Sequence, residues 1–292
     1  MANAKELRGR IKSVGNIRQI TKAMEMVASM KLRKVQARAQ SNRVLIDELR
    51  SLMGRVMRSF AKDVEHAIFT AREFKTIGVF LVTSDRGLCG AYNSNILARF
   101  HKLEDELKAQ HPGAKIVLYV YGRKGYSYLT RRKYEVLRYF ADPPLEKADL
   151  HALRIARDAI VGDYLEGKID AVFSCFTHFV SAGRFEPSIE TMLPIDPKVF
   201  LAEDGPRIDY LVEPDPETVL RWFVPRYLSG VIYDAMMQSL TSEQAARRMA
   251  MKGATDAATR MTKELKMAYN RARQESITKE LLDIVGGTAA VS

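Results

Sequence analysis

The chain has 292 residues, of which 47% are hydrophobic and 28% charged, a composition typical of a folded globular protein. It lacks both the ~18 consecutive apolar residues that span a bilayer and an apolar secretory signal at its start, so we interpret the start as mature protein. The net charge of +11 is concentrated at the two ends, where it favours acidic partners.

Both ends of the chain are free of proline, because all ten prolines lie between Pro112 and Pro225. Proline interrupts helices, so this distribution predicts two long helices attached to one compact domain. The first helix is expected over residues 4–66, a length of roughly 90 Å. Its apolar stripe is Leu7, Ile11, Val14, Ile17, Ile20, Met24, Val27, Leu45, Leu49, Leu52, Val56 and Phe60.

The middle of the chain alternates strand-like and helix-like segments. Strands rich in Val, Ile, Phe and Tyr are expected at 75–83, 115–121, 134–140 and 169–178, with possible edge strands at 188–194 and 208–212. Helices are expected between them at 93–110, 124–131 and 146–166. Such alternation predicts an α/β domain with a mainly parallel sheet and helices on both faces.

Two loops, at residues 84–93 and 122–125, follow predicted strands where a parallel sheet holds phosphate. Neither has the spacing GxGxxG or GxxxxGK[ST], so we interpret both as structural. Cys89 and Cys175 are far apart, without CxxC spacing, and are expected to be reduced thiols. No Ser/His/Asp or carboxylate pattern demands catalysis and no histidine pair has metal-ligand spacing, so we expect no active site, cofactor or metal.

The second long helix is expected to begin with Asp215 as N-cap and Pro216 at its first position, to bend at Pro225, and to end at Gly286–Gly287. Its stripe is Ala246, Ala250, Ala254, Ala257, Met261, Leu265, Ala268 and Ala272. The eleven-residue period favours a nearly straight or slightly right-handed stripe. The two long helices either join an ordinary helical bundle or form an antiparallel pair. A pair alone leaves apolar and basic surface that a partner would enclose.

Four segments resemble the γ subunit of F-type ATP synthase, in its bacterial form, and the resemblance covers the whole chain in order. They are RQITKAMEMVA at residues 18–28, SDRGLCG at 84–90, SEQAAR at 242–247 and YNRARQESITKE at 269–280.

The resemblance implies an antiparallel coiled coil of residues 1–70 and 213–292, with a Rossmann-like α/β domain at 71–212. It implies a non-catalytic central rotor, which ion flow through the membrane-embedded c ring turns inside a ring of α and β subunits. Nucleotide chemistry would occur on β, ε and the c ring would contact the foot, and the chain would be peripheral to the cytoplasmic face of the bacterial inner membrane.

Individual positions carry the family's contacts over to this chain. The resemblance implies contact with the α/β ring, and a role in coupling, for Lys22, Met24, Glu243, Gln244, Arg247, Arg273, Gln274, Thr278 and Glu280. For the foot, which meets the c ring and ε, it implies Tyr210 and Glu213. Met24 also fits a simple packing position, and each charged residue fits a solvated helix face.

Two other functions fit parts of the sequence. A nucleic-acid-binding protein would use the basic helices as clamps, with an affinity that falls steeply with salt. The aromatic residues argue mildly against it, since most lie in the middle of the chain, away from the basic helices. A small-molecule enzyme with helical arms would need a ligand at residues 85–93.

Overall fold

The computed structural model describes residues 4–60, 67–201, 213 and 215–291, and the chain divides into two compact units. Unit 1 combines the chain up to Ser29 with the chain from Arg247, and unit 2 is Met30–Ala246. The helices α1 (Ala4–Phe60) and α6 (Pro216–Val291) contribute to both units. The units therefore differ in their limits from the predicted domains, whose division by chain segment stays a prediction.

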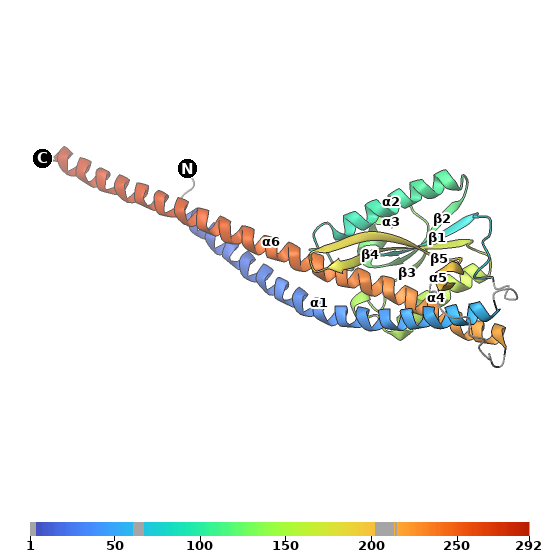
Figure 1. Cartoon of the computed structure of the whole chain (residues 1–292). Coiled ribbons are helices and arrows are strands. Elements are labelled where there is room, and N and C mark those ends of the chain that lie inside the picture. Colours follow the sequence, from blue (N-terminus) through green and yellow to red (C-terminus); the bar gives the residue numbers. More distant parts are fainter. Residues whose placement is uncertain (1–3, 61–66, 202–212, 214, 292) are drawn as a thin grey trace. The chain divides into compact units, whose positions relative to one another are not determined.

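Unit 2 is built on a five-stranded sheet with the order β3-β2-β1-β4-β5 (Figure 1). The strands are β1 (Thr76–Val82), β2 (Lys115–Tyr121), β3 (Val136–Phe140), β4 (Ala171–Ser181) and β5 (Arg184–Leu193). All neighbours pair in parallel except β5, which runs antiparallel to β4 at the edge. The predicted mainly parallel sheet and the edge strand near 188–194 are confirmed, whereas 208–212 lies outside the described residues.

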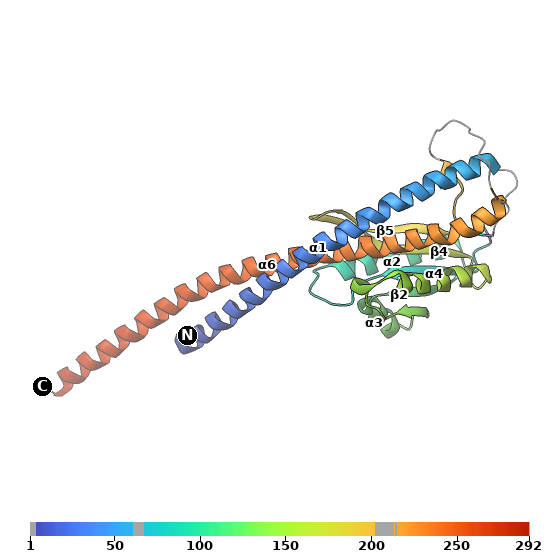
Figure 2. The ribbon, with the colours of Figure 1, turned by 90° about the horizontal axis from the view of Figure 1, so that it is seen from below.

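Alternate side chains of each strand point to opposite faces of the sheet, so the sheet has an apolar core on each side. Ile77, Val79 and Leu81 pack on the side of α2 (Tyr92–Gln110) and α3 (Arg123–Arg131). Phe80 and Val82 belong to the other core, with α4 (Leu150–Leu165) and the unit 2 parts of α1 and α6. Figures 1 and 2 show this covering of both faces, which confirms the predicted α/β architecture.

Several helix limits follow from local chemistry. The α6 helix begins as predicted, since the Asp215 carboxylate accepts a hydrogen bond from the Thr218 amide at 2.8 Å. The helix predicted over 146–166 is divided into η1 (Leu145–Lys147) and α4, because Asp149 caps α4 by accepting from two backbone amides. The short helix α5 (Lys198–Leu201) was not predicted.

The prediction that α6 ends at Gly286–Gly287 is wrong, because the helix continues to Val291. Glycine inside a helix costs only about 1 kcal/mol relative to alanine, so it does not by itself end one. The helix also continues through Pro225. None of the described helices combines the length and the hydropathy needed to cross a membrane.

Unit 1 is an antiparallel pair formed by the two ends of the chain. Its covered positions on α6 recur at alternating steps of four and three residues, the heptad spacing of a coiled coil. They are Met251, Thr255, Ala258, Thr262, Leu265, Tyr269 and Ala272. On α1 the covered positions in unit 1 include Leu7, Ile11, Val14, Thr21, Glu25 and Ala28. This set of residues is called the seam below.

The predicted stripes are correct in part. Leu7, Ile11 and Val14 on α1 and Leu265 and Ala272 on α6 lie on the seam as predicted, but other predicted members do not. Ile17, Ile20 and Val27 on α1 are about half exposed, at 52%, 59% and 45%, and on α6 Ala257, Met261 and Ala268 are exposed. A heptad advances 3.5 residues per turn and an eleven-residue period about 3.67, so the second drifts away from a heptad seam by roughly 17° per turn. The seam spacing is that of a left-handed coiled coil, not of the straight or right-handed stripe predicted from the alanines.

Candidate functional site

Unit 1 exposes large apolar side chains on both of its helices. On α1 these are Ile17, Ile20, Met26 and Val27, and on α6 they are Met249, Met261, Met267, Ile277, Leu281 and Leu282. The seam between the two helices contains small and polar residues such as Thr21 and Ala28 beside larger ones such as Leu7 and Met251. Exposed apolar side chains that gather on one segment of a folded protein indicate a contact surface, so the outer face of unit 1 is the first candidate site.

The predicted coupling residues near the amino terminus lie beside the seam. Met24 is half-buried, and Lys22 is exposed, with its ammonium 3.1 Å from the Glu25 carboxylate. Glu25 is itself largely covered, with 18% of its side chain exposed, so the ion pair joins the seam to the surface. Lys22 is thus accessible to a partner, whereas Met24 packs partly within the helix pair.

The SEQAAR segment falls at the limit between the two units. In unit 2, Glu243 and Gln244 are buried, with exposures of 6% and 2%, and the Gln244 amide lies 3.4 Å from the Glu243 carboxylate. The neighbouring Ser242 hydroxyl donates to the carbonyl of Thr177 in β4 at 3.1 Å. Glu243 and Gln244 therefore lie inside unit 2, while Arg247 is half-buried in unit 1.

The buried carboxylate of Glu243 affects the pKa of a nearby tyrosine. Tyr92, at the start of α2, is fully buried, and burial, followed by the nearby charge of Glu243, raises the pKa of its phenol. Tyr92 and Cys89 form a small apolar cluster with Ala246, which places the SDRGLCG loop against α6 within unit 2. The SDRGLCG and SEQAAR motifs, which are far apart in the sequence, are thus parts of one packed region.

The predicted contacts near the carboxyl terminus lie along one exposed stretch of α6. Arg273, Gln274 and Thr278 are exposed, and the Thr278 hydroxyl donates to the carbonyl of Gln274 at 2.9 Å. The side chain of Glu280 lies outside the described residues. Of the two foot residues, Glu213 is exposed and Tyr210 lies outside the described residues.

The loop at 84–93 is held by the chain itself. The Asp85 carboxylate accepts hydrogen bonds from the amides of Arg123, at the start of α3, and Leu145, each at 3.1 Å. It thus occupies the helix N-terminus at which a phosphate would bind. Gly122 has a φ of 104°, and a Cβ there would lie 2.2 Å from the carbonyl oxygen of Thr83, so the second loop is equally tight. These contacts support the structural interpretation of both loops.

A basic concavity of about 840 Å³ lies beside these loops. Its lining includes five cations, Arg86, Arg123, Lys124, Arg131 and Arg132, against the single carboxylate of Asp85. The Arg132 guanidinium stacks over Tyr128 at 3.8 Å. The near-neutral net charge of the middle region hides this cluster at the level of sequence, although basic pairs stand at both ends of α3, at 123–124 and at 131–132.

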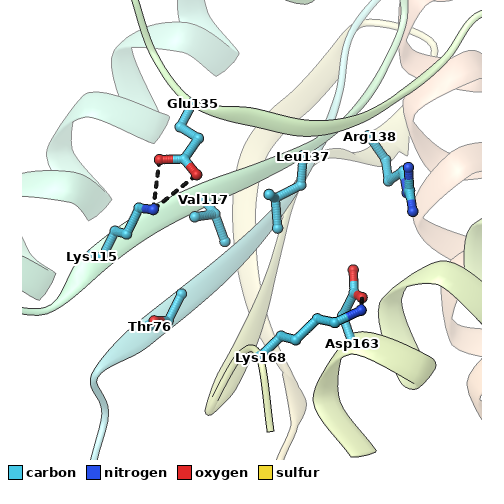
Figure 3. Close-up of a pocket in the computed structure, with 8 residues that line it drawn as sticks. All are labelled: Thr76, Lys115, Val117, Glu135, Leu137, Arg138, Asp163 and Lys168. Atoms are coloured by element: carbon cyan, nitrogen blue, oxygen red, sulfur yellow. Dashed lines mark hydrogen bonds and ion pairs between the residues drawn. The ribbon is translucent and has the colours of Figure 1, made fainter. Parts of the chain in front are cut away.

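A smaller cavity of about 290 Å³ lies between β2, β3 and α4 (Figure 3). Four of its charges are paired: the Lys115 ammonium lies 2.8 Å from Glu135, and the Lys168 ammonium lies 3.0 Å from Asp163. Arg138 also lines the cavity. Burial raises the pKa of Asp163, but hydrogen bonds from Tyr119 and Lys168 outweigh it, so the net shift is downward. Each of these two lysines is thus neutralised by a carboxylate of the chain itself.

Thiol and metal chemistry find no support in the described residues. Cys89 and Cys175 are both buried, and neither forms a disulfide with another described residue. Burial raises the pKa of the Cys175 thiol to about 12, so it is not a reactive thiolate. The described part of the chain contains no cluster of three His, Cys, Asp or Glu residues that fits a metal ion.

Comparison with known families places the whole chain in one group. The family model described as "ATP synthase" matches residues 3–291. The ATP synthase gamma chain of Polaromonas sp. is 40% identical over 297 residues, and that of Polynucleobacter asymbioticus is 38% identical over 296. In both comparisons the alignment covers all of this chain and all of the relative.

Solved structures share the fold. A chain of the Euglena gracilis mitochondrial ATP synthase aligns with a TM-score of 0.69 at 20% identity, covering 99% of this chain and 94% of that chain. A chain from the central stalk and c ring of the Tetrahymena thermophila mitochondrial ATP synthase aligns with a TM-score of 0.56 at 25% identity, covering 80% of this chain and 99% of that chain.

Proposed function

The chain belongs to the ATP synthase gamma chain family, and from this premise we propose that it is the central-stalk rotor of a bacterial F-type ATP synthase. It turns inside a ring of α and β subunits and supplies torque and asymmetry, while nucleotide chemistry takes place on β. The observation that carries the proposal is the construction of unit 1, in which the two helices form a seam and further large apolar residues, such as Ile17, Ile20 and Met267, remain exposed outside it. A helix pair of this kind requires a surrounding partner.

Contact with the ring is proposed for residues of both helices. Lys22, Arg273, Gln274 and Thr278 are accessible for it, with Glu280 as a further proposed contact and Arg247 and Met24 at the edge of the seam. Such contacts bias the β subunits only through different affinities for their conformations. Glu243 and Gln244, proposed from the resemblance as neighbours of that contact, are buried and would act by fixing the position of Arg247.

The basic concavity adds a second surface for an acidic partner. Its five cations around one internally bonded carboxylate give a local positive field that attracts acidic loops. Within the rotor this concavity is proposed to meet the ring, whereas Tyr210 and Glu213 are proposed to meet the c ring and ε. The assembly would hold the chain as a peripheral protein at the cytoplasmic face of the inner membrane, where ion flow drives it.

The proposal is tested by ATP hydrolysis with purified α and β subunits from the same source. Adding the chain should give a stable complex and a sustained turnover above that of α and β alone. A chain that neither joins the complex nor changes turnover would overturn the proposal. The relatives named above give no support to nucleic-acid binding. If DNA at low salt does not displace the chain from α and β, nucleic-acid binding is excluded as its function.

The outer face of unit 1 can be tested separately. Serine at Ile17, Ile20 and Val27 removes apolar surface that is already about half exposed, so the helix pair should still form. Assembly with the ring should weaken, because each buried aliphatic side chain contributes about 1.5–3 kcal/mol at a contact. The matched control is Leu165→Ser, at an exposed leucine of α4 in unit 2. Equal assembly of the triple variant and the control would contradict this use of unit 1.

A further inference from the structure

Unit 2 contains an apolar groove that the contacts proposed above do not use. The groove has a volume of about 780 Å³ and is bordered by α1, α4 and α6, which lie on the same side of the sheet (Figure 2). Leu45 and Leu49 of α1, Leu150 and Leu153 of α4 and Tyr233 of α6 supply its apolar surface. We call it the α1–α4–α6 groove.

Two leucines of the groove are more exposed than packing within the chain explains. Leu150 is 81% exposed and Leu45 is 54% exposed, although both stand next to buried residues of the same core. Leaving a leucine in water instead of burying it costs about 1.5–3 kcal/mol. Two such residues facing one groove indicate a surface that another molecule covers.

The groove is formed before any partner binds. The side-chain amide of Asn42, which is 8% exposed, donates to the carbonyl oxygen of Gly230 at 3.2 Å and so joins α1 to α6. Gly230 allows this approach, because a Cβ there would lie 3.0 Å from the side chain of Ile46. A fixed spacing between the two helices lowers the ordering cost of binding.

The rim of the groove is basic. Arg38 and Arg226 line it, and Lys34 and Lys147 line an adjoining hollow of about 560 Å³. Among the residues described, Lys34, Arg38 and Lys147 take part in no ion pair.

The carboxylates nearby are already engaged within the chain. Glu146 lies 2.7 Å from the Lys31 ammonium, and Asp149 accepts from the amides of His151 and Ala152 to cap α4. The charge that remains for a partner is therefore positive.

These features define the partner. Lys34 and Arg38 are four residues apart on α1, about one helical turn, and the groove itself runs from Ala37 to Leu49 along the same helix, a length of roughly 18 Å at ~1.5 Å per residue. A third helix fits between two packed helices in this way, with an apolar stripe toward the groove. A second copy of this chain is disfavoured by its net charge of +11.

We propose that the α1–α4–α6 groove binds an amphipathic helix of a partner protein, with apolar side chains against Leu45 and Leu150 and acidic side chains against Arg38 and Arg226. The inference rests on the proposed function in that the partner is sought within the assembled ATP synthase. It adds an interaction surface of unit 2 to the contacts proposed for unit 1.

The test is photo-crosslinking in the assembled complex. Benzoylphenylalanine replaces Leu45 or Leu150, and in a matched control it replaces Leu165, which is 49% exposed on the same α4 helix but does not line the groove. Both groove positions should crosslink to one and the same protein segment, with acidic residues flanking its apolar stripe. The control position should not.

Charge reversal completes the test. Arg38→Glu with Arg226→Glu should lower the crosslink yield about tenfold through like-charge repulsion, and lysine at the acidic positions of the captured segment should restore it. Arg38→Lys with Arg226→Lys keeps the charge and should retain the crosslink, which separates loss of charge from loss of fold.

Several outcomes would overturn the inference. Crosslinks to lipid, to a second copy of the chain or to no macromolecule, or a yield that charge reversal leaves unchanged, each exclude an acidic helix in the groove. If the complex assembles and turns over normally without a protein crosslink, the groove inference alone fails. If the chain does not assemble with ATP synthase subunits at all, the proposed function fails first.

Discussion

The polar pair in the seam of unit 1 gives a prediction whose size follows from the structure. The Thr255 hydroxyl lies 2.9 Å from the Thr21 hydroxyl of the other helix and 2.8 Å from the carbonyl oxygen of Met251. A hydroxyl has one proton, so Thr255 donates to one of these at a time. The Thr21 hydroxyl can in turn donate to the carbonyl of Arg18 at 3.1 Å.

Replacing Thr255 with valine keeps the shape and removes this link between the helices. Thr21 retains its bond to Arg18, so no hydroxyl is left unsatisfied, and the loss is that of one hydrogen bond, about 0.5–1.5 kcal/mol. The added methyl group recovers part of this by apolar burial. A loss near 1 kcal/mol accelerates the opening of unit 1 about fivefold.

Hydrogen exchange of the full chain measures this opening for the amides around both threonines. The matched control is Thr262→Val, since Thr262 also lies on the seam but donates only to its own helix, to the carbonyl of Ala258 at 2.7 Å. Faster exchange is expected for Thr255→Val and not for the control. Equal exchange in the two variants would refute the argument, as would a double-mutant cycle with Thr21→Val that shows no coupling.

Three further predictions concern other parts of the chain. Gly230→Ala should destabilise unit 2 by about 1–3 kcal/mol through overpacking against Ile46, whereas Gly253→Ala, with nothing within 4 Å, should stabilise its helix by about 0.5–1 kcal/mol, both measured by thermal unfolding. Since burial raises the pKa of Cys175 to about 12 from 9.0, its contribution to stability is complete below pH 9.0 and falls as the pH rises toward 12. In urea titrations, the free energy of unfolding should therefore fall less above pH 9.0 for Cys175→Ala than for the unsubstituted chain. An equal fall in both would contradict the raised pKa of Cys175. Arg273→Ala, at an exposed position, should leave the melting transition within about 0.5 kcal/mol but lower ion-driven ATP synthesis in the assembled complex; unchanged synthesis would count against a ring contact.

The sheet of unit 2 was predictable because its strands carry long runs of Val, Ile, Phe and Tyr between punctuating turns. Burial on both faces makes such runs continuous, and this leaves the strand limits uncertain by only a few residues. The segment limits near Asp149 and Asp215 also depend on local side-chain chemistry. At Asp149 the observed limit differs from the predicted one, because the cap divides one predicted helix into two.

The seam was not predictable in the same way. A stripe read from the largest apolar residues selects Ile17, Ile20 and Val27, yet the seam of unit 1 includes Thr21 and Ala28. The periodicity argument assumes that the chain alone buries its apolar surface. That assumption fails when a partner covers part of a helix. The exposed members of the predicted stripe, Ile17, Ile20 and Val27, are therefore candidates for a contact surface.

The division of residues in unit 1 links its own stability to its assembly. Alanine and threonine in the seam allow close approach of two helices but contribute little burial, while Ile17 and Ile20 would contribute their burial only against another protein. A partner that binds the ordered pair and not the disordered chain stabilises the pair by mass action. The Thr21–Thr255 contact then has a separate role: it favours one register of the two helices over others, as a polar pair does in a coiled coil. A rotor that transmits torque needs such a fixed register, because helices free to slide past each other would convert rotation into axial slip. On the proposed function, the seam would therefore provide register, and contact with a partner at the outer face would provide the affinity that keeps the pair in place.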